Sequence, residues 1–248
     1  MNIDYNHAPA QNPQTMGGPS AAWPKLFPDG IPASILDVGC GIGTWLKAAI
    51  NAGVIDVFGI DGVQIPPEQL LFPPNKFLCR DLTKPVDLGR RFDVVICLEV
   101  AEHIETNSSN ILIETLTKHS DTVIFSAACV GQPGQHHVNC QWPHYWQQLF
   151  NKRGFVCEDN LRWQIWDDVR IERWYRQNIF VARSEVASAG HEPRIKAVVH
   201  PEMLSPILPE KETFENHVKQ IENGRMGIMW YLKTPVFAFF EKLKRHLA

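Results

Sequence analysis

The chain has 248 residues, of which 44% are hydrophobic and 21% are charged, so it can bury one sizeable core and is neither a small disulfide scaffold nor a disordered chain. Its 24 basic and 27 acidic side chains give a formal net charge of -3, which is too near neutral for a dedicated nucleic-acid binder. The six cysteines form no CxxC pair, and the N-terminus lacks the basic and apolar runs of a secretory signal. We therefore expect a cytoplasmic protein with reduced thiols.

The N-terminal segment is rich in proline. Residues 1–33 hold six prolines and a Gly17-Gly18 pair, and proline interrupts the hydrogen-bond ladders of helices and sheets. We expect this segment to be a flexible leader, or a lid that folds over a ligand, without long helices or strands.

From residue 34 to 184, short apolar runs alternate with helix-like stretches. Seven apolar runs predict strands, at residues 34–38, 54–60, 76–79, 92–98, 121–127, 154–158 and 178–182. Three stretches place apolar residues three or four apart and predict amphipathic helices, at residues 44–53, 110–119 and 143–154. Because strands that alternate with helices form parallel sheets, the expected fold is α/β, with a mostly parallel sheet covered by helices on both faces.

The most specific pattern is the turn after the first predicted strand, in SILDVGCGIGTWL at residues 34–46. Three glycines follow Asp37 at alternate positions: Gly39, Gly41 and Gly43. Glycine is needed where φ is positive or where a ligand approaches the backbone closely, and at the carboxyl end of a central strand that ligand is usually a nucleotide. A dinucleotide fingerprint would need its third glycine at Thr44, and Asp37 would repel a pyrophosphate. We therefore expect a nucleotide ligand that carries an amino group.

This turn resembles motif I of the class I S-adenosylmethionine-dependent methyltransferases. The later segments VFGID, FLCRDL and FDVVICLEVAEHI resemble further motifs of that family in the right order. The resemblance implies a Rossmann-like fold with a seven-stranded sheet, and S-adenosylmethionine as the cofactor. It also implies that residues 34–184 are the catalytic domain.

The resemblance further implies which residues contact the cofactor. Asp61 would accept both ribose hydroxyls, a task that suits the two oxygens of a carboxylate. The other implied contacts are the turn itself (Asp37, Gly39, Gly41, Gly43), the adenine contacts (Asp81, Leu82) and the strand end beneath the methyl group (Leu98, Glu99). Taken singly, Asp61 and Asp81 are equally well solvated strand ends, since strand ends are normally polar.

The loop after the fifth predicted strand, residues 126–146, is dense in imidazole, amide and aromatic side chains. In a class I fold this loop lies beside the methyl group, and it also resembles the histidine-asparagine loop and WPxYW helix start of bacterial methyltransferases associated with glycan and polysaccharide synthesis. Aromatic rings stack on sugar faces and amides pair with hydroxyls. We therefore expect acceptor contacts from Asn139, Gln141, Trp142, His144 and Tyr145.

Methyl transfer to an alcohol needs a general base, because the hydroxyl has a high pKa. We predict His137 as this base, with His136, His103 and His144 as the next candidates. Each histidine is equally well a polar loop residue or a helix cap. A zinc site would draw on Cys129, His136, His137, Cys140 and His144, but their spacing matches no familiar pattern, and we predict no metal.

Another segment near the acceptor is residues 162–178, whose arginines and tryptophans would close over the acceptor. The alternative is a surface excursion with a solvated, mixed-charge face.

Past residue 184 the alternation of strands and helices ends. Residues 185–248 predict a linker, or a strap on the surface, and then a helical extension with helices at 213–223 and 227–247. The apolar run in the last of these is too short to span a bilayer. Residues 227–248 would therefore make peripheral contact with an anionic membrane, or pack on the domain or on a second subunit of a homo-oligomer.

Together these patterns predict an S-adenosylmethionine-dependent methyltransferase that methylates an oxygen of a sugar or glycan. Two alternatives stay open. One is a methyltransferase for a small-molecule or lipid-like acceptor, including an amine, and the other is a non-catalytic methyltransferase-like binding subunit.

Overall fold

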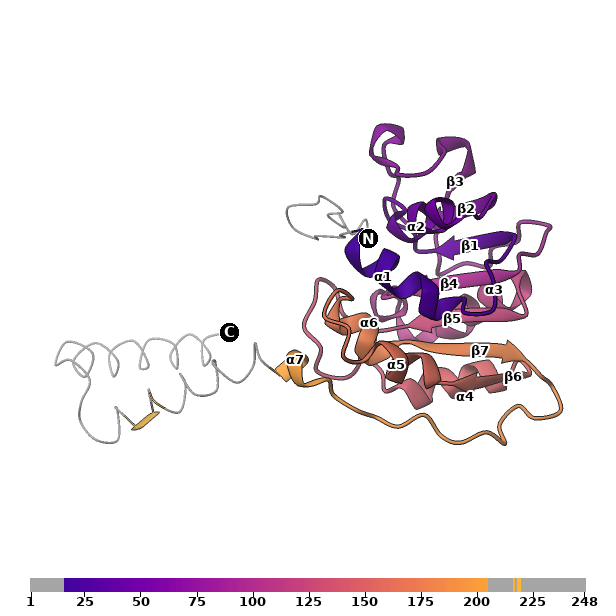
Figure 1. Cartoon of the computed structure of the whole chain (residues 1–248). Helices are drawn as coiled ribbons and strands as arrows, with labels where there is room; N and C mark the ends of the chain where they lie inside the picture. Colours follow the sequence, from indigo (N-terminus) through magenta and orange to yellow (C-terminus); the bar gives the residue numbers. More distant parts are fainter. Residues whose placement is uncertain (1–15, 205–215, 217, 220–248) are drawn as a thin grey trace, which may run out of the picture. The chain divides into compact units, whose positions relative to one another are not determined.

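The computed structural model describes residues 16–204, 216, 218 and 219 (Figure 1). The chain divides into two compact units, residues 1–200 and residues 201–248. The described residues of the second unit include helix α7 (Pro201–Leu204). The fold and the site described below belong to the first unit.

The first unit is built on a seven-stranded sheet with the strand order β3-β2-β1-β4-β5-β7-β6. The strands are β1 (Ser34–Val38), β2 (Asp56–Asp61), β3 (Phe77–Cys79), β4 (Val94–Leu98), β5 (Thr122–Ser126), β6 (Phe155–Glu158) and β7 (Phe180–Ser184). All pairs are parallel except those that β7 makes with β5 and β6. The expected α/β fold with a seven-stranded, mostly parallel sheet is therefore confirmed.

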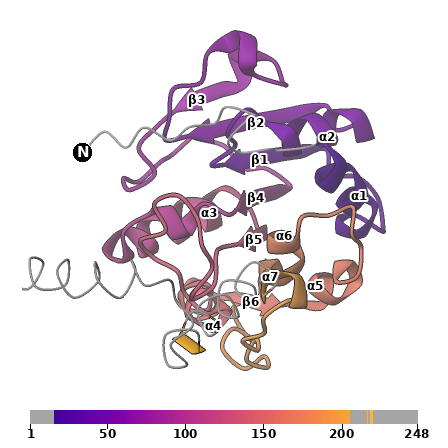
Figure 2. The same cartoon turned by 90° about the vertical axis from the view of Figure 1, so that its left-hand side faces the viewer.

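Helices cover both faces of this sheet. In order they are α1 (Gly17–Leu26), α2 (Thr44–Ala52), α3 (Ser109–His119), α4 (Pro143–Asn151), α5 (Asn160–Ile165) and α6 (Arg173–Asn178). Short 3-10 turns occupy Pro67–Gln69, Pro74–Lys76, Ala101–His103 and Thr106–Ser108. Figure 2 shows α3 and α4 on one side of the strands and α1, α2 and α5 on the other.

The strands are buried on both faces, which explains their continuous apolar runs. Along β4, Val95 and Cys97 belong to the core cluster that contains α3 and α4. Val94, Ile96 and Leu98 alternate with them and belong to the cluster that contains α1, α2 and α5. The parallel strands therefore end at one edge with their carboxyl ends side by side, which is where ligands bind in folds of this kind.

The N-terminal segment differs from the expectation that it lacks a long helix. Residues 17–26 form α1, which includes two prolines, and Trp23 is buried in the core beside residues of α2 and α5. Pro19 is tolerated because it lies in the first turn, where its missing N–H would have no partner. Burial of Trp23 then stabilises a helix that composition alone argues against. Residues 1–15 lie outside the described part of the chain.

The structure also differs from the predicted domain end at residue 184, because the segment 185–200 packs on the first unit. Ile195 lies in the core cluster with α3 and α4. Glu192 accepts hydrogen bonds from Nδ2 of Asn151 at 2.6 Å and Nε2 of Gln147 at 2.9 Å. Burial would raise the pKa of Glu192, but these bonds outweigh it and lower the pKa to about 2. The segment is therefore a surface strap that is held by the hydrogen bonds of Glu192 and by the burial of Ile195.

No helix among the described residues is long and apolar enough to cross a membrane. The predicted helix at 227–247 lies outside the described residues. Only three residues of the predicted helix at 213–223 are described, and these three are helical.

Candidate active site

The glycine turn connects the carboxyl end of β1 to α2. Gly39, Gly41 and Gly43 all have positive φ, at 83°, 50° and 87°. A Cβ on Gly39 would collide with the side chain of Val100, and one on Gly43 would collide with the ring of Phe72. These two glycines are therefore required by backbone conformation and by close packing together.

Asp61, at the end of β2, holds this turn in place. Its Oδ2 accepts the N–H of Gly41 at 2.7 Å, and its Oδ1 accepts the N–H of Val63 at 2.8 Å. The side chain is buried, with 6% of its surface exposed. One carboxylate thus orders both the glycine turn and the start of the next loop.

Asp37 lies in β1 between β2 and β4, paired with Gly59 and Ile96. It is buried, and burial raises its pKa well above the usual range, with a further rise from the charge of Asp61. Two neighbouring acids at one sheet edge favour a ligand that brings positive charge.

Asp81 and Leu82 follow β3 at the same edge of the sheet. The Oδ1 of Asp81 accepts the hydroxyl of Thr83 at 2.6 Å and its N–H at 2.9 Å. These two bonds, the side-chain one first, lower the pKa of Asp81. Asp81 is exposed and Leu82 is buried, so an acid and an apolar side chain stand next to each other at this strand end.

Leu98 and Glu99 end β4. Glu99 has a φ of 55°, a left-handed conformation that is rare for a non-glycine residue and is concentrated at functional sites. Its carboxylate accepts Nε2 of Gln132 at 2.9 Å and Nδ2 of Asn178 at 3.1 Å. Burial raises the pKa of Glu99, and the two amides act against this rise. The strained backbone and the amide pair together fix the carboxylate at the strand end.

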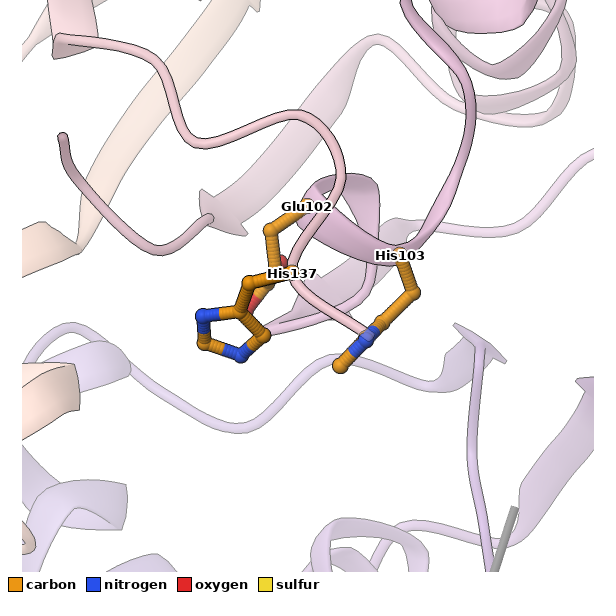
Figure 3. Close-up of side chains that lie close together, drawn as sticks. All are labelled: Glu102, His103 and His137. Atoms are coloured by element: carbon orange, nitrogen blue, oxygen red, sulfur yellow. The ribbon is translucent and has the colours of Figure 1, made fainter. Parts of the chain in front are cut away.

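Glu102, His103 and His137 lie close together in Figure 3, the first two from the 3-10 turn after β4 and the third from the loop after β5. The imidazole rings of His103 and His137 have centroids 5.0 Å apart and planes at 69°. Burial lowers the pKa of His103 to about 4, and burial also lowers the pKa of His137. Both rings are therefore neutral at physiological pH.

Asn139 anchors the loop that carries His137. Its side chain is buried and bonds to the hydroxyls of Ser109 and Thr106, at 3.0 Å and 2.8 Å. The backbone N–H groups of Val138 and Asn139 both donate to the carbonyl of Glu102. These contacts hold the loop against the turn after β4, so Asn139 has a structural role whether or not it contacts the acceptor.

The other predicted acceptor residues lie further along the loop and at the start of α4. Nε2 of Gln141 donates to Oδ1 of Asn139 at 3.1 Å. Trp142 caps α4, Nδ1 of His144 lies 3.2 Å from Oε1 of Gln147, and Tyr145 packs on the core and on Trp146. All four are partly exposed. No contact recorded in the described residues joins Trp142, His144 or Tyr145 to the His103 and His137 pair.

His136 is exposed and has a φ of 52°. The five residues of the zinc alternative do not form a metal-competent group within the described part of the chain. Nε2 of Gln177 instead donates to the sulfur of Cys129 at 2.9 Å. Of those five, only His137 belongs to the group that does form, with Glu102 and His103.

The segment 162–178 is solvated only in part: Asp168 and Arg170 pair at the surface, whereas both ends of the segment are buried. Arg162 is fully buried, and its guanidinium donates to the carbonyl of Lys196 at 3.2 Å. Gln177 and Asn178, at the end of α6, are buried too, and Asn178 reaches Glu99 and Gln132. The segment therefore supplies polar groups to the site. The sequence shows no local sign of this role, since Asn178 lies 79 residues from Glu99.

Comparisons with known proteins agree with this architecture. A family model described as "Methyltransferase domain" matches residues 14–164, more than half of the chain. No curated protein matches the chain in sequence. Among solved structures, a magnesium protoporphyrin IX methyltransferase from Synechocystis with bound S-adenosylhomocysteine is 20% identical, covers 75% of this chain and 90% of its own, and has a TM-score of 0.51.

Two further solved structures share the fold. A sugar N-methyltransferase from a Streptoalloteichus species is 14% identical, covers 75% of this chain and 97% of its own, and has a TM-score of 0.53. Streptomyces venezuelae DesVI is 13% identical, covers 73% and 99%, and has a TM-score of 0.54. At these identities the likeness shows the fold alone.

The chain belongs to the methyltransferase domain family. It is thus an enzyme, and the expectation of a Rossmann-like methyltransferase with S-adenosylmethionine as its cofactor is confirmed.

Proposed function

We propose that this enzyme transfers the methyl group of S-adenosylmethionine to a hydroxyl oxygen of a sugar or glycan. The observation that carries the proposal is the order of groups along one sheet edge. At the ends of β1 and β2 lies the glycine turn, which is hydrogen-bonded to Asp61. Beyond the end of β4 lie the neutral imidazoles of His103 and His137. The first set suits the donor, and the second suits an acceptor that must lose a proton.

The donor would lie across the carboxyl ends of β1, β2 and β3. Its ammonium group would offset the buried charge of Asp37, whose pKa is raised when no such group is present. Asp61 would accept the ribose hydroxyls with the lone pairs that its backbone bonds leave. Asp81 and Leu82 would contact the adenine amino group and ring face, and Leu98 and Glu99 would lie beneath the methyl group.

The acceptor would enter on the side of His103 and His137. As its oxygen forms a bond to the methyl carbon, the bond from that carbon to sulfur breaks, and the hydroxyl proton must leave. Nδ1 of His137 lies 3.0 Å from the carbonyl oxygen of Gln132 and so carries its hydrogen, which puts the lone pair on Nε2. Nε2 of His137 is thus able to take the proton.

An amine acceptor is the second candidate, because a sugar N-methyltransferase shares the fold. An amine that arrives neutral needs no base. The paired neutral imidazoles favour the hydroxyl, since they would have no task in transfer to an amine.

The test is transfer of a labelled methyl group from S-adenosylmethionine to glycan, small-molecule and protein fractions. His137→Ala is expected to lower kcat on the labelled acceptor by about 100-fold or more, the usual contribution of a general base, with unchanged affinity for S-adenosylhomocysteine. His191→Ala, at an exposed histidine in the strap, is the control and is expected to keep full activity. Full kcat in His137→Ala, or label found only on amine nitrogen, would contradict the proposal.

A further inference from the structure

We propose that Glu102, His103 and His137 bind a divalent transition-metal ion. Each of these residues offers one ligand atom, and the three atoms all lie within 4.8 Å of one another. Figure 3 shows the three side chains gathered where the turn after β4 meets the loop after β5. The sequence-based prediction was no metal, and the zinc alternative shares only His137 with this group.

Glu102 gives the strongest argument for a bound cation. Its side chain has 0% of its surface exposed, its carboxyl group lies against that of Glu99, and neither of its oxygens has a partner in full hydrogen-bond geometry. Buried carboxylates are normally hydrogen-bonded, paired with a cation or bound to a metal. The neighbouring Glu99 does not fill this need, because burial and then the like charge of Glu99 both raise the pKa of Glu102. A cation between Glu102 and the two imidazoles would.

The two histidines are oriented as metal ligands usually are. Nδ1 of His137 lies 3.0 Å from the carbonyl oxygen of Gln132, and Nδ1 of His103 lies 3.3 Å from that of His136. A carbonyl only accepts, so Nδ1 of His137 carries hydrogen and its Nε2 carries the lone pair. Metal-bound histidines almost always donate their other N–H in this way, which fixes the ring.

The protein backbone also holds the three ligands together before any ion binds. The N–H groups of Val138 and Asn139 donate to the carbonyl of Glu102, at 2.9 Å and 3.0 Å. The side chain of Asn139 bonds to Ser109 and Thr106. The residue after His137 is therefore tied directly to Glu102, so little conformational entropy is lost when the site is filled.

The ligand set indicates the kind of ion. Two imidazole nitrogens and one carboxylate suit Zn²⁺, Mn²⁺, Fe²⁺ or Co²⁺ better than Mg²⁺ or Ca²⁺, which prefer oxygen ligands. Three protein ligands leave coordination positions open, as in catalytic metal sites. This part of the inference does not depend on the acceptor.

The consequence for catalysis rests on the proposed function. An acceptor hydroxyl bound at an open position would have a lowered pKa and would release its proton to water as its oxygen attacks the methyl group. His137 would then be a ligand of the ion and no longer the base. Methyl transfer would then depend on the metal. The favoured acceptor would be a molecule with two neighbouring hydroxyls that can both bind the ion.

The test is titration of untagged protein, stripped with a chelator, with Co²⁺ followed by visible absorption and with Zn²⁺ followed by calorimetry. We expect one ion per chain. Removing a residue that only orients a metal ligand lowers metal affinity by about 10- to 100-fold. Glu102 and His103 are proposed as ligands themselves, so Glu102→Gln and His103→Ala are each expected to lower the affinity by about 100-fold. Glu105→Gln and His191→Ala, at exposed residues, are the matched controls and are expected to bind as wild type does.

Thermal unfolding separates a lost ligand from a damaged fold. Glutamine has nearly the shape of glutamic acid and has no charge to bury, so the metal-free Glu102→Gln variant is expected to unfold at the same or a higher temperature than metal-free wild type. It is also expected to lose the rise that Co²⁺ gives wild type. No binding at millimolar Co²⁺ and Zn²⁺, or equal binding by Glu102→Gln, would overturn the metal site. If protein kept free of metal by a chelator still transfers the methyl group, the proposed function stands and the ion has no catalytic role. Tight metal binding without transfer to any fraction would instead overturn the proposed function.

Discussion

Asp61→Ala is expected to lower the affinity for S-adenosylhomocysteine by about 100-fold, which corresponds to about 2.7 kcal/mol. The change removes the proposed acceptor for the ribose hydroxyls. It also leaves the backbone N–H groups of Gly41 and Val63 without their acceptor, so the glycine turn loses the bond that orders it. Calorimetric titration with S-adenosylhomocysteine measures the loss.

The control for this prediction is Asp56→Asn, at the opposite end of the same strand. Asp56 is partly exposed and pairs with Lys76, so its replacement is expected to leave the affinity for the cofactor unchanged. Equal affinities in Asp61→Ala and wild type would show that the end of β2 does not hold the cofactor.

Gly39→Ala is expected to lower the free energy of unfolding by about 2–5 kcal/mol. A non-glycine residue at a φ of 83° costs about 1–2 kcal/mol, and overpacking adds about 1–3 kcal/mol, because the new Cβ collides with Val100. Urea unfolding at equilibrium measures the difference.

A second glycine separates strain from collision in this experiment. Gly190 also has a φ of 83°, but nothing lies within 4 Å of a Cβ added there. Gly190→Ala is therefore expected to cost only the conformational part, and Gly39→Ala combined with Val100→Ala is expected to cost less than the sum of the two single changes. If Gly39→Ala cost no more than Gly190→Ala, close packing of the turn on Val100 would be contradicted.

The sequence predicted the sheet well because its signal is local. Apolar runs such as the one at residues 92–98 contain strands that are buried on both faces, and each needs only its own residues to be recognised. The glycine turn is local for the same reason, since positive φ at Gly39, Gly41 and Gly43 restricts the residue type at each position.

The parts that the sequence did not predict depend on partners far along the chain. Helix α1 exists despite Pro19 and Pro24 because Trp23 is buried on the other helices of its layer. The sequence left open whether residues 185–200 are a linker or a surface strap. The contact of Glu192 with Asn151 makes the segment a strap, and neither side chain indicates the other in sequence. In both cases tertiary burial outweighs the local pattern.

The candidate site likewise has a part that the sequence predicts and a part that only the folded chain shows. The motif containing Glu99 and His103 is visible in the sequence, but the burial of Glu102 between them is not. An acid in a turn is normally solvated, so local sequence gives no reason to expect a fully buried carboxyl group. The contact between His103 and His137 closes over 33 intervening residues, and only the folded chain shows it.

The most direct test of the central claim is calorimetric titration of the wild-type chain with S-adenosylhomocysteine. The site at the ends of β1, β2 and β4 predicts saturable binding of one molecule per chain, weakened in Asp61→Ala and unchanged in Asp56→Asn. Absence of binding at millimolar concentration, in protein that is folded by thermal unfolding, would contradict an S-adenosylmethionine-dependent enzyme.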